Sequence, residues 1–429
     1  MNNLFIRREI TSGVLRKVID LRILLGVGLL AYFSSILYFG YFVGNYRSFW
    51  YYVLGVDAHY FLFFDLDGIA AGCESIREGF DPFLLNPNDT ICRKLNYPRV
   101  WHLLSYTGFS RRDTFYAGIV LALIFFFTCF SYFEKIPPKE WPRFCLYFVA
   151  LFSSNVMFLV ERGNNDIIIF GLLVVAISFR NKPWLFHSLI LLSSILKLYP
   201  IVACASGLKK DIRNNLPVII TVLAFLLYIA FTWADLALVS SATPRSTWLS
   251  YGMNVLWEVV SQNVPLSFIF FTQKILPFIL VILLLITAFF YAFSSDRNLK
   301  GLANTKYGCG FLIGAMVYCS TFVIGNNFDY RLSFLILVIP QLYDWAKEEK
   351  GIGLCTLSIF SVLLLLWNNA LFNYFRFIGF ENILFFVEEI ISWILFYALL
   401  LSMFKWMISE FSLKDYFGKA GSLQGEFKN

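Results

Sequence analysis

Apolar runs long enough to cross a membrane recur along the 429-residue chain and constrain its fold more than any other feature. A bilayer core about 30 Å thick requires about 20 apolar residues from one helix. Only 15% of the residues are charged, whereas soluble proteins carry about 25%. The pattern predicts an all-α polytopic membrane protein. It excludes a disordered chain, a disulfide-rich secreted module and a soluble nucleic-acid binder.

The chain is expected to form one membrane-embedded domain, residues 1–429, with about ten full spans. The first span is interpreted as an uncleaved signal anchor, because its apolar run is too long for a signal-peptide core. The ten expected spans are Leu24–Gly44, Thr114–Phe133, Phe144–Val160, Ile167–Phe179, Leu216–Leu236, Ile275–Phe293, Gly308–Ile324, Leu332–Trp345, Gly353–Trp367 and Leu384–Phe404.

The segment 183–208 is apolar but interrupted at Lys197–Pro200. As a single span it would place Lys209, Lys210 and Arg213 outside the cell, against the tendency of basic residues to stay in the cytoplasm. A re-entrant pair of half-helices keeps them inside, and Pro200, which lacks an N–H donor, breaks the helix there. We therefore predict a re-entrant pair.

With this topology most of the 35 Lys and Arg residues lie on the cytoplasmic side, together with both termini and the tail 405–429. The net charge of +7 is then mainly an orientation signal. The predicted location is the inner membrane of a bacterium. The long first outer loop, 45–113, contains a short amphipathic helix at Ile69–Gly79 and would face the periplasm.

Polar residues collect on the outer face around the predicted helix break. Ionisable groups within or beside apolar spans are costly, so they are candidate functional residues. The clusters are Asp65 and Asp67, Asn96–His102, Glu161–Asp166, Lys197 with Tyr199, and Gly325–Arg331.

Three stretches resemble the GT-C glycosyltransferases, and most closely the bacterial polyprenol-phosphate-mannose-dependent mannosyltransferases (glycosyltransferase family 87). The first is Asp65 followed by Gly79-Phe80-Asp81-Pro82-Phe83. The second is Glu161-Arg162-Gly163-Asn164-Asn165-Asp166 with Leu196-Lys197-Leu198-Tyr199-Pro200. The third is Asn327-Phe328-Asp329-Tyr330-Arg331-Leu332.

The resemblance implies a GT-C-like fold and transfer of a sugar from a polyprenyl-phosphate donor to a glycolipid or glycan acceptor. An acidic residue of the first outer loop would be the catalytic base. Asp65 matches that position by its spacing to Gly79, with Asp67 as the second candidate. Mannose is the sugar that the family implies, and glucose, galactose and arabinofuranose are the alternatives.

The chemistry of such a transfer assigns roles to the remaining polar residues. A leaving phosphate gains negative charge, which fixed cations stabilise. The candidate donor-phosphate ligands are Arg162, Lys197, Arg331 and Arg99. The candidate sugar or acceptor ligands are Asn164, Asn165, Tyr199, Asp329, Tyr330 and His102.

No cofactor and no metal are predicted, since no Cys/His cluster has zinc-ligand spacing. Cys73 and Cys92 both lie in the predicted first outer loop, where they could form a disulfide or stay as two free thiols. The alternative functions are a lipid-linked-sugar transporter or flippase and an O-antigen ligase or polymerase. Transporters often contain matching broken helices in two halves, and the sequence indicates one break only.

Overall fold

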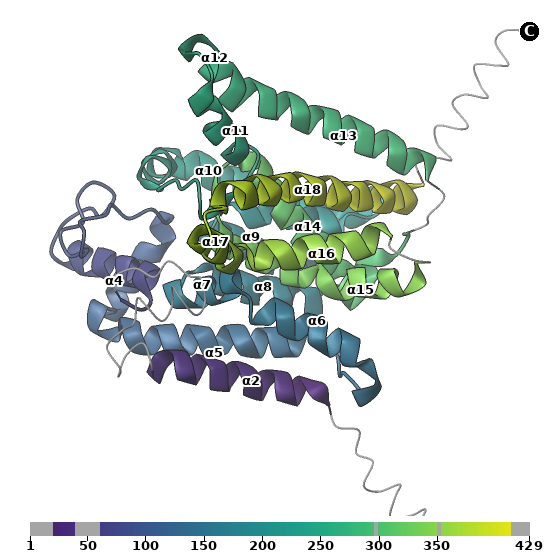
Figure 1. Cartoon of the computed structure of the whole chain (residues 1–429). Helices are drawn as coiled ribbons and strands as arrows, with labels where there is room; N and C mark the ends of the chain where they lie inside the picture. Colours follow the sequence, from purple (N-terminus) through teal and green to yellow (C-terminus); the bar gives the residue numbers. More distant parts are fainter. Residues whose placement is uncertain (1–19, 39–60, 296–298, 350–352, 413–429) are drawn as a thin grey trace, which may run out of the picture.

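The computed structural model describes residues 20–38, 61–295, 299–349 and 353–412, and its regular structure is almost entirely helical (Figure 1). The one sheet in these residues is an antiparallel pair of two-residue strands, β1 (Ser250–Tyr251) and β2 (Asn327–Phe328). The predicted all-α class is confirmed.

Five helical segments are long and apolar enough to cross a membrane. They are α5 (Thr114–Tyr132) with η3 (Arg111–Asp113); α10 (Leu216–Ala242) with η6 (Ile212–Asn215); α12 (Leu266–Phe270), η8 (Phe271–Ile275) and α13 (Leu276–Ser294) in sequence; α14 (Lys306–Ile324); and α18 (Glu381–Phe411). These are the helices of a membrane protein.

Two further candidate spans are bent pairs. η4 (Pro138–Glu140) and α6 (Trp141–Leu151) meet α7 (Ser154–Arg162) at 46°, and α16 (Leu354–Leu366) meets α17 (Asn368–Phe377) at 64°. Counting each pair as one span gives up to seven spans in the described residues. The prediction of about ten full spans is therefore wrong for this part of the chain.

Two of the missing spans are helices that are too short: α2 (Leu21–Leu37) and α8 (Asp166–Ser178) have 17 and 13 residues. α9 (Pro183–Leu196), predicted as half of the re-entrant pair and not as a full span, has 14 residues. A helix rises 1.5 Å per residue, so 13 residues extend only about 20 Å, less than a bilayer core. The expected first span also continues beyond α2, outside the described residues.

The expected span Leu332–Trp345 is not one helix either. It is divided between the 3-10 helix η10 (Asp329–Leu337) and α15 (Ile339–Glu348). Pro340 lies in the first turn of α15, where its missing N–H and fixed φ favour the start of a new helix. Apolar composition alone did not reveal this division.

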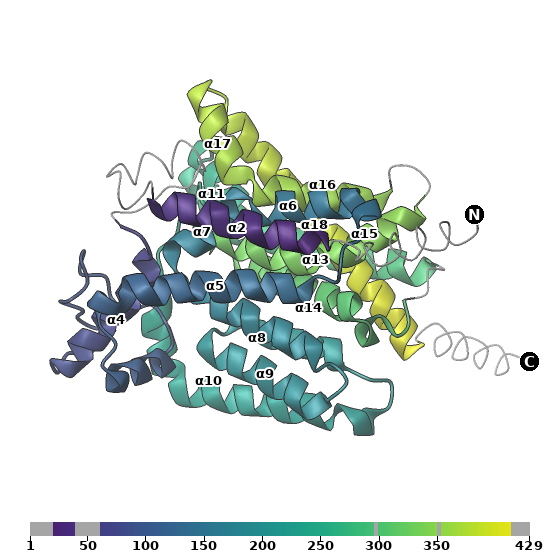
Figure 2. The same ribbon diagram turned by 90° about the horizontal axis from the view of Figure 1, so that it is seen from below.

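The long helices lie side by side, and α4 (Phe64–Arg77) lies at one end of the bundle (Figures 1 and 2). The start of α2 and the end of α18 lie at the other end. Loops rich in basic residues share that second end, where Arg22 donates to the Phe133 carbonyl oxygen and Arg180 to that of Asn304. We call the two ends the α4 end and the basic end.

The segment 183–208 turns back on itself. α9 runs from Pro183 to Leu196, and the 3-10 helix η5 (Tyr199–Gly207) follows the break. Pro183 and Gly207 line the same cavity, so the chain leaves the basic end and returns to it. The position of this hairpin in a bilayer stays a prediction.

α14 lies at the centre of the bundle, with 83% of its most apolar stretch buried. Gly310 allows Tyr132 of α5 to approach, since a Cβ at Gly310 would lie 2.0 Å from the Tyr132 hydroxyl. That hydroxyl donates to the Leu337 carbonyl oxygen at 2.8 Å. One glycine thus permits a hydrogen bond between α5 and η10 in the core.

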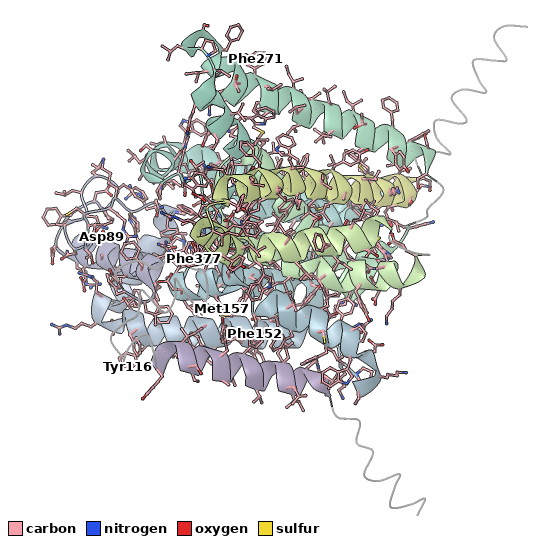
Figure 3. All side chains as sticks on the ribbon, in the orientation of Figure 1. Asp89, Tyr116, Phe152, Met157, Phe271 and Phe377 are labelled. Carbon is pink, nitrogen blue, oxygen red and sulfur yellow. The ribbon has the colours of Figure 1, made fainter. Side chains whose placement is uncertain are left out.

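The outer surface of the bundle is apolar. Tyr116, Phe271 and Phe377 are exposed on it, whereas Met157 is fully buried (Figure 3). Such a surface suits lipid contact.

The remaining short helices are η2 (Arg99–Thr107), α11 (Val255–Val260), η7 (Ser261–Asn263) and η9 (Leu302–Asn304).

Candidate functional site

The first turn of α4 is fixed against the end of α7. The Phe63 N–H donates to the Glu161 carbonyl oxygen at 2.7 Å, and Phe63 has a left-handed backbone (φ +63°), which is uncommon for a bulky residue. The Phe63 ring packs on Gly118, where any Cβ would clash with it. These contacts place Asp65, two residues later, beside α7.

Asp65 contacts both Arg162 and Asn164. The Asn164 amide nitrogen donates to Asp65 Oδ2 at 2.6 Å, and Arg162 Nη1 lies 3.7 Å from Asp65 Oδ1. The Asp65 side chain is 15% exposed and that of Arg162 is 8% exposed. Asp65 is thus oriented by two groups and still reaches the surface of a cavity.

Gly163 makes the turn that presents Asn164, Asn165 and Asp166. It has φ +56° directly after α7, the left-handed conformation in which glycine commonly ends a helix. Asp166 then begins α8, where a negative charge is favoured by the helix dipole.

Asp166 is the centre of a buried ionic cluster. Its Oδ1 lies 2.6 Å from Lys197 Nζ and accepts a hydrogen bond from the Tyr199 hydroxyl at 2.8 Å. Its Oδ2 lies 3.3 Å from Arg331 Nε. The Asp166 carboxylate is fully buried. Two predicted phosphate ligands and one predicted sugar ligand therefore converge on Asp166, a member of the candidate cluster Glu161–Asp166 to which no role was assigned.

Asn164 connects this cluster to Asp65. Its Oδ1 accepts from Lys197 Nζ at 3.1 Å, while its Nδ2 donates to Asp65. Lys197 Nζ also donates to Asn165 Oδ1 at 2.9 Å. The positive charge of Lys197 is thus surrounded by protein acceptors.

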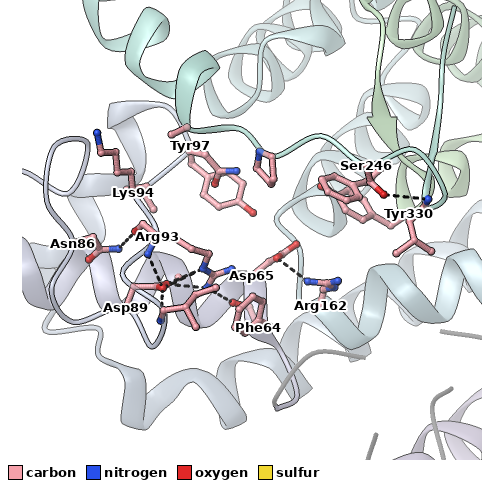
Figure 4. Close-up of a pocket in the computed structure, with 18 residues that line it drawn as sticks. Phe64, Asp65, Asn86, Asp89, Arg93, Lys94, Tyr97, Arg162, Ser246 and Tyr330 are labelled. Carbon is pink, nitrogen blue, oxygen red and sulfur yellow. Dashed lines mark hydrogen bonds and ion pairs between the residues drawn. The ribbon is translucent and has the colours of Figure 1, made fainter. Parts of the chain in front are cut away.

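A cavity of about 620 Å³ opens beside Asp65 and Arg162 at the α4 end (Figure 4). Its size falls in the range of small-molecule sites, roughly 300–1,000 Å³. Tyr97 and Tyr330 line it together with Phe64 and the segment Ala242–Leu249. The complete lining is Phe64, Asp65, Gly68, Asn86, Asp89, Ile91, Arg93, Lys94, Leu95, Asn96, Tyr97, Arg162, Ala242, Pro244, Ser246, Leu249, Phe328 and Tyr330.

Two more cations line the cavity, and sequence reasoning missed both. Arg93 forms an ion pair with Asp89 at 2.8 Å and stacks on Phe64 at 3.6 Å. Lys94 is exposed and makes no hydrogen bond or ion pair with any described residue. Only Leu95 separates them from the Asn96–His102 stretch already noted for its polar residues, and that proximity was the available signal.

Asp67 does not line the cavity. It forms an ion pair with Arg111 at 3.0 Å, and Arg111 also donates to the Asn88 carbonyl oxygen and the Thr90 hydroxyl. Burial raises the pKa of the Asp67 carboxyl, against the opposing effect of Arg111. Of the two candidate bases, the structure brings only Asp65 to Arg162 and the cavity.

Three other predicted site residues belong neither to the cavity lining nor to the cluster around Asp166. Arg99 pairs with Asp235 at 2.7 Å and Asp81 at 3.3 Å. His102 packs on the Phe83 ring with a centroid distance of 4.7 Å. Asp329 is fully buried and accepts a hydrogen bond from Asn368. The structure gives these residues partners of their own rather than a place beside Asp65.

Cys73 and Cys92 are both free thiols, Cys73 buried and Cys92 exposed. Across the described residues, no group of three or more His, Cys, Asp or Glu side chains is arranged to hold a metal ion. The cavity therefore offers two carboxylates, Asp65 and the Asp89 that pairs with Arg93, three cations and two tyrosine rings. Comparison of the chain with protein-family models, with curated proteins and with solved structures finds no match.

Proposed function

We propose that this protein is an inverting glycosyltransferase that moves a hexose, mannose or glucose, from a polyprenyl-phosphate carrier to a glycolipid or cell-envelope glycan. The observation that carries the proposal is Asp65 beside Arg162 on the wall of the 620 Å³ cavity. A carboxylate next to cations matches the needs of a displacement at a sugar phosphate.

Asp65 acts as the general base. It takes the proton of the acceptor hydroxyl while that oxygen attacks the anomeric carbon, a role that requires contact at about 3 Å. Asn164, at 2.6 Å, holds one carboxylate oxygen and leaves the other toward Arg162. The new glycosidic bond forms as the bond from the anomeric carbon to the phosphate oxygen breaks, and the anomeric configuration inverts.

Arg162 and Lys94 receive the leaving lipid phosphate. The contacts of Arg162 with Asp65 and Glu161, at 3.7 and 3.4 Å, are longer than hydrogen bonds, so its guanidinium retains donors for a phosphate. Lys197 and Arg331 are reassigned as positioning residues, because both contact the Asp166 carboxylate. Tyr97 and Tyr330 line the space for the sugar.

The cavity lies at the α4 end, opposite the basic loops. If the basic end faces the cytoplasm, the reaction takes place on the outer face of the inner membrane. The apolar outer surface leaves the isoprenoid chain of the donor in the bilayer. No nucleotide site is needed for such a donor.

The test uses membranes that contain the full chain and a labelled polyprenyl-phosphate sugar. Asp65→Asn is expected to lower turnover at least about 100-fold, the usual contribution of a general base. Asp67→Asn is the matched control, since Asp67 lies two residues away in the same helix and contacts Arg111 instead. Full turnover by Asp65→Asn contradicts the assignment.

One observation favours the alternative of a lipid-linked-sugar transporter. The structure has two bent pairs, α6–α7 and α16–α17. The sequence indicated neither of them, and its one expected break lies in a different segment, at Lys197–Pro200. They meet at their bends, since Asn155 of α7 donates to Asn368 of α17 at 2.8 Å and to the Leu365 carbonyl oxygen at 2.7 Å. Paired broken helices are typical of secondary transporters.

The two functions differ in their products. A transporter moves labelled lipid-linked sugar across a proteoliposome membrane with no new glycosidic bond. A glycosyltransferase forms that bond when the acceptor is supplied. Transport without product would replace the proposed function.

A further inference from the structure

A second cavity, of about 510 Å³, lies at the basic end, away from Asp65. Three parts of the chain form it: the turn between α8 and α9, the connection from η5 to α10, and the residues around the start of α14. Its lining residues used below are Arg180, Trp184, His187, Lys209, Arg213 and Leu216. The proposed transfer reaction uses none of them.

The charge of this cavity is one-sided. Arg180, Lys209 and Arg213 line it, and its lining includes no carboxylate. The nearby Asp211 accepts from the backbone N–H of Arg213 and from the Asn214 amide, so it contacts the connection rather than the cations. The Arg213 guanidinium makes no hydrogen bond or ion pair with the described residues. The cavity therefore presents uncompensated positive charge.

Two of the cations are held in place. Arg180 Nε donates to the Asn304 carbonyl oxygen at 2.8 Å, and Lys209 Nζ donates to Asn304 Oδ1 at 3.1 Å. Both contacts are to neutral oxygens, so neither cation is neutralised. The cavity has fixed charges before any ligand enters, which lowers the entropic cost of binding.

His187 supplies a buried polar group on the cavity wall. It is only 2% exposed, and its Nδ1 has no hydrogen-bond partner among the described residues. Gly207 passes so close that a Cβ there would lie 2.4 Å from His187 Nε2. A buried polar atom without a partner is costly, and a ligand that reached His187 Nδ1 would satisfy it.

The surroundings of the cavity suit a membrane interface. Trp184 is 56% exposed and Leu216 is 50% exposed, and tryptophan is enriched where head groups meet acyl chains. Beyond them, exposed apolar residues continue along α9 and α10, namely Leu185, Leu192, Ile219, Ile220 and Leu223. A molecule in the cavity could thus have its charged end inside and its chains along these helices.

We propose that this cavity binds the phosphate-bearing head group of an anionic lipid. Basic pockets between helices on the cytoplasmic side recognise such groups. Arginine and lysine donors match a phosphate, and His187 adds a donor or acceptor at the buried side. This site is independent of the proposed glycosyltransferase activity.

Native mass spectrometry of the full chain in detergent micelles tests the site, with phosphatidylglycerol, phosphatidylcholine or inorganic phosphate added separately. Phosphatidylglycerol is expected to bind in preference to phosphatidylcholine. Arg213→Gln is expected to weaken it about fivefold, since one basic residue near an anionic head group contributes about 1 kcal/mol. Lys210→Gln is the matched control, because Lys210 is exposed and adjacent but does not line the cavity.

The outcomes separate the sources of the phosphate. Inorganic phosphate that competes with phosphatidylglycerol supports recognition of the phosphate group itself. Binding of inorganic phosphate with no preference between the two lipids overturns the lipid proposal in favour of a free anion. If both lipids bind equally and inorganic phosphate does not bind, the cavity is not a phosphate site. If Arg213→Gln and Lys210→Gln have equal effects on binding, the lipid does not bind in this cavity. Lys209→Gln is a second variant with the same expected direction.

Discussion

The side-chain amide nitrogen of Asn164 lies 2.6 Å from Oδ2 of Asp65, although the two residues are 99 positions apart. The other end of the same amide accepts from Lys197. An amide is suited to this place because it presents a donor on one side and an acceptor on the other. Asn164 thus links the carboxylate in the cavity to the buried cluster around Asp166.

Asn164→Ala is expected to lower kcat about 10- to 100-fold with a smaller effect on KM. The removed hydrogen bond to a charged group contributes about 1.5–3 kcal/mol, and it orients the proposed base. Steady-state kinetics with a labelled lipid-linked sugar measure the change. Asn214→Ala, an exposed asparagine at the basic end, is the control. An unchanged kcat would show that the Asp65–Asn164 contact has no part in turnover.

Asp166→Asn is expected to destabilise the fold by about 3–5 kcal/mol, because Lys197 and Arg331 would lose a buried anionic partner. Thermal unfolding of the purified protein measures the loss. The double variant Asp166→Asn with Lys197→Met removes one uncompensated charge and should recover part of it. If the single variant unfolds at the wild-type temperature, the cluster does not stabilise the fold.

The region around His102 in η2 is expected to lose stability as the pH falls from about 6.5 to about 4. Burial lowers the pKa of His102 to about 4 from its ordinary value of 6.5, so in this range the unfolded chain binds a proton that the folded chain does not. The effect is complete below about pH 4, where both states are protonated.

Unfolding temperatures at pH 7 and pH 5 measure this dependence. His102→Phe should reduce the difference between the two temperatures, since His102 Nε2 has no hydrogen-bond partner to lose among the described residues. An identical pH dependence in wild type and variant would mean that His102 is not its source.

Gly310→Ala is expected to destabilise the bundle by about 1–3 kcal/mol, the usual cost of overpacking a core. The new Cβ would meet the Tyr132 hydroxyl and break its hydrogen bond to Leu337. Tyr132→Phe combined with Gly310→Ala removes the clashing oxygen and should be less destabilising than the sum of the two single changes. Strict additivity in thermal unfolding would contradict this contact.

The class of the protein and part of its site could be predicted from residue patterns. The apolar runs predict helices that suit a membrane, because burial in lipid depends mainly on composition over a short window. Asp65, Arg162 and Asn164 were chosen as ionisable or polar residues beside such runs, and the structure brings all three together. The preference for Asp65 over Asp67 came from the family resemblance and not from these runs.

Span number and pairing could not be predicted in the same way. Bends at α6–α7 and α16–α17, and the division of Leu332–Trp345, depend on how neighbouring helices satisfy freed backbone groups. The structure contains these two bent pairs in addition to the break at Lys197–Pro200 that the sequence indicated. Hydropathy averages over such breaks and overestimates the number of full spans.

The sequence by itself determined a membrane-embedded helical chain with an acidic candidate in the long segment between its first two apolar runs. Only the tertiary structure decided which charges are available to a ligand. Lys197 and Arg331 look like equal phosphate ligands in the sequence, but Asp166 contacts both, and it is Arg162 that lies on the cavity lining beside Asp65. The reason is physical: the interaction of two charges depends on their separation in space and on burial, and neither is set by distance along the chain.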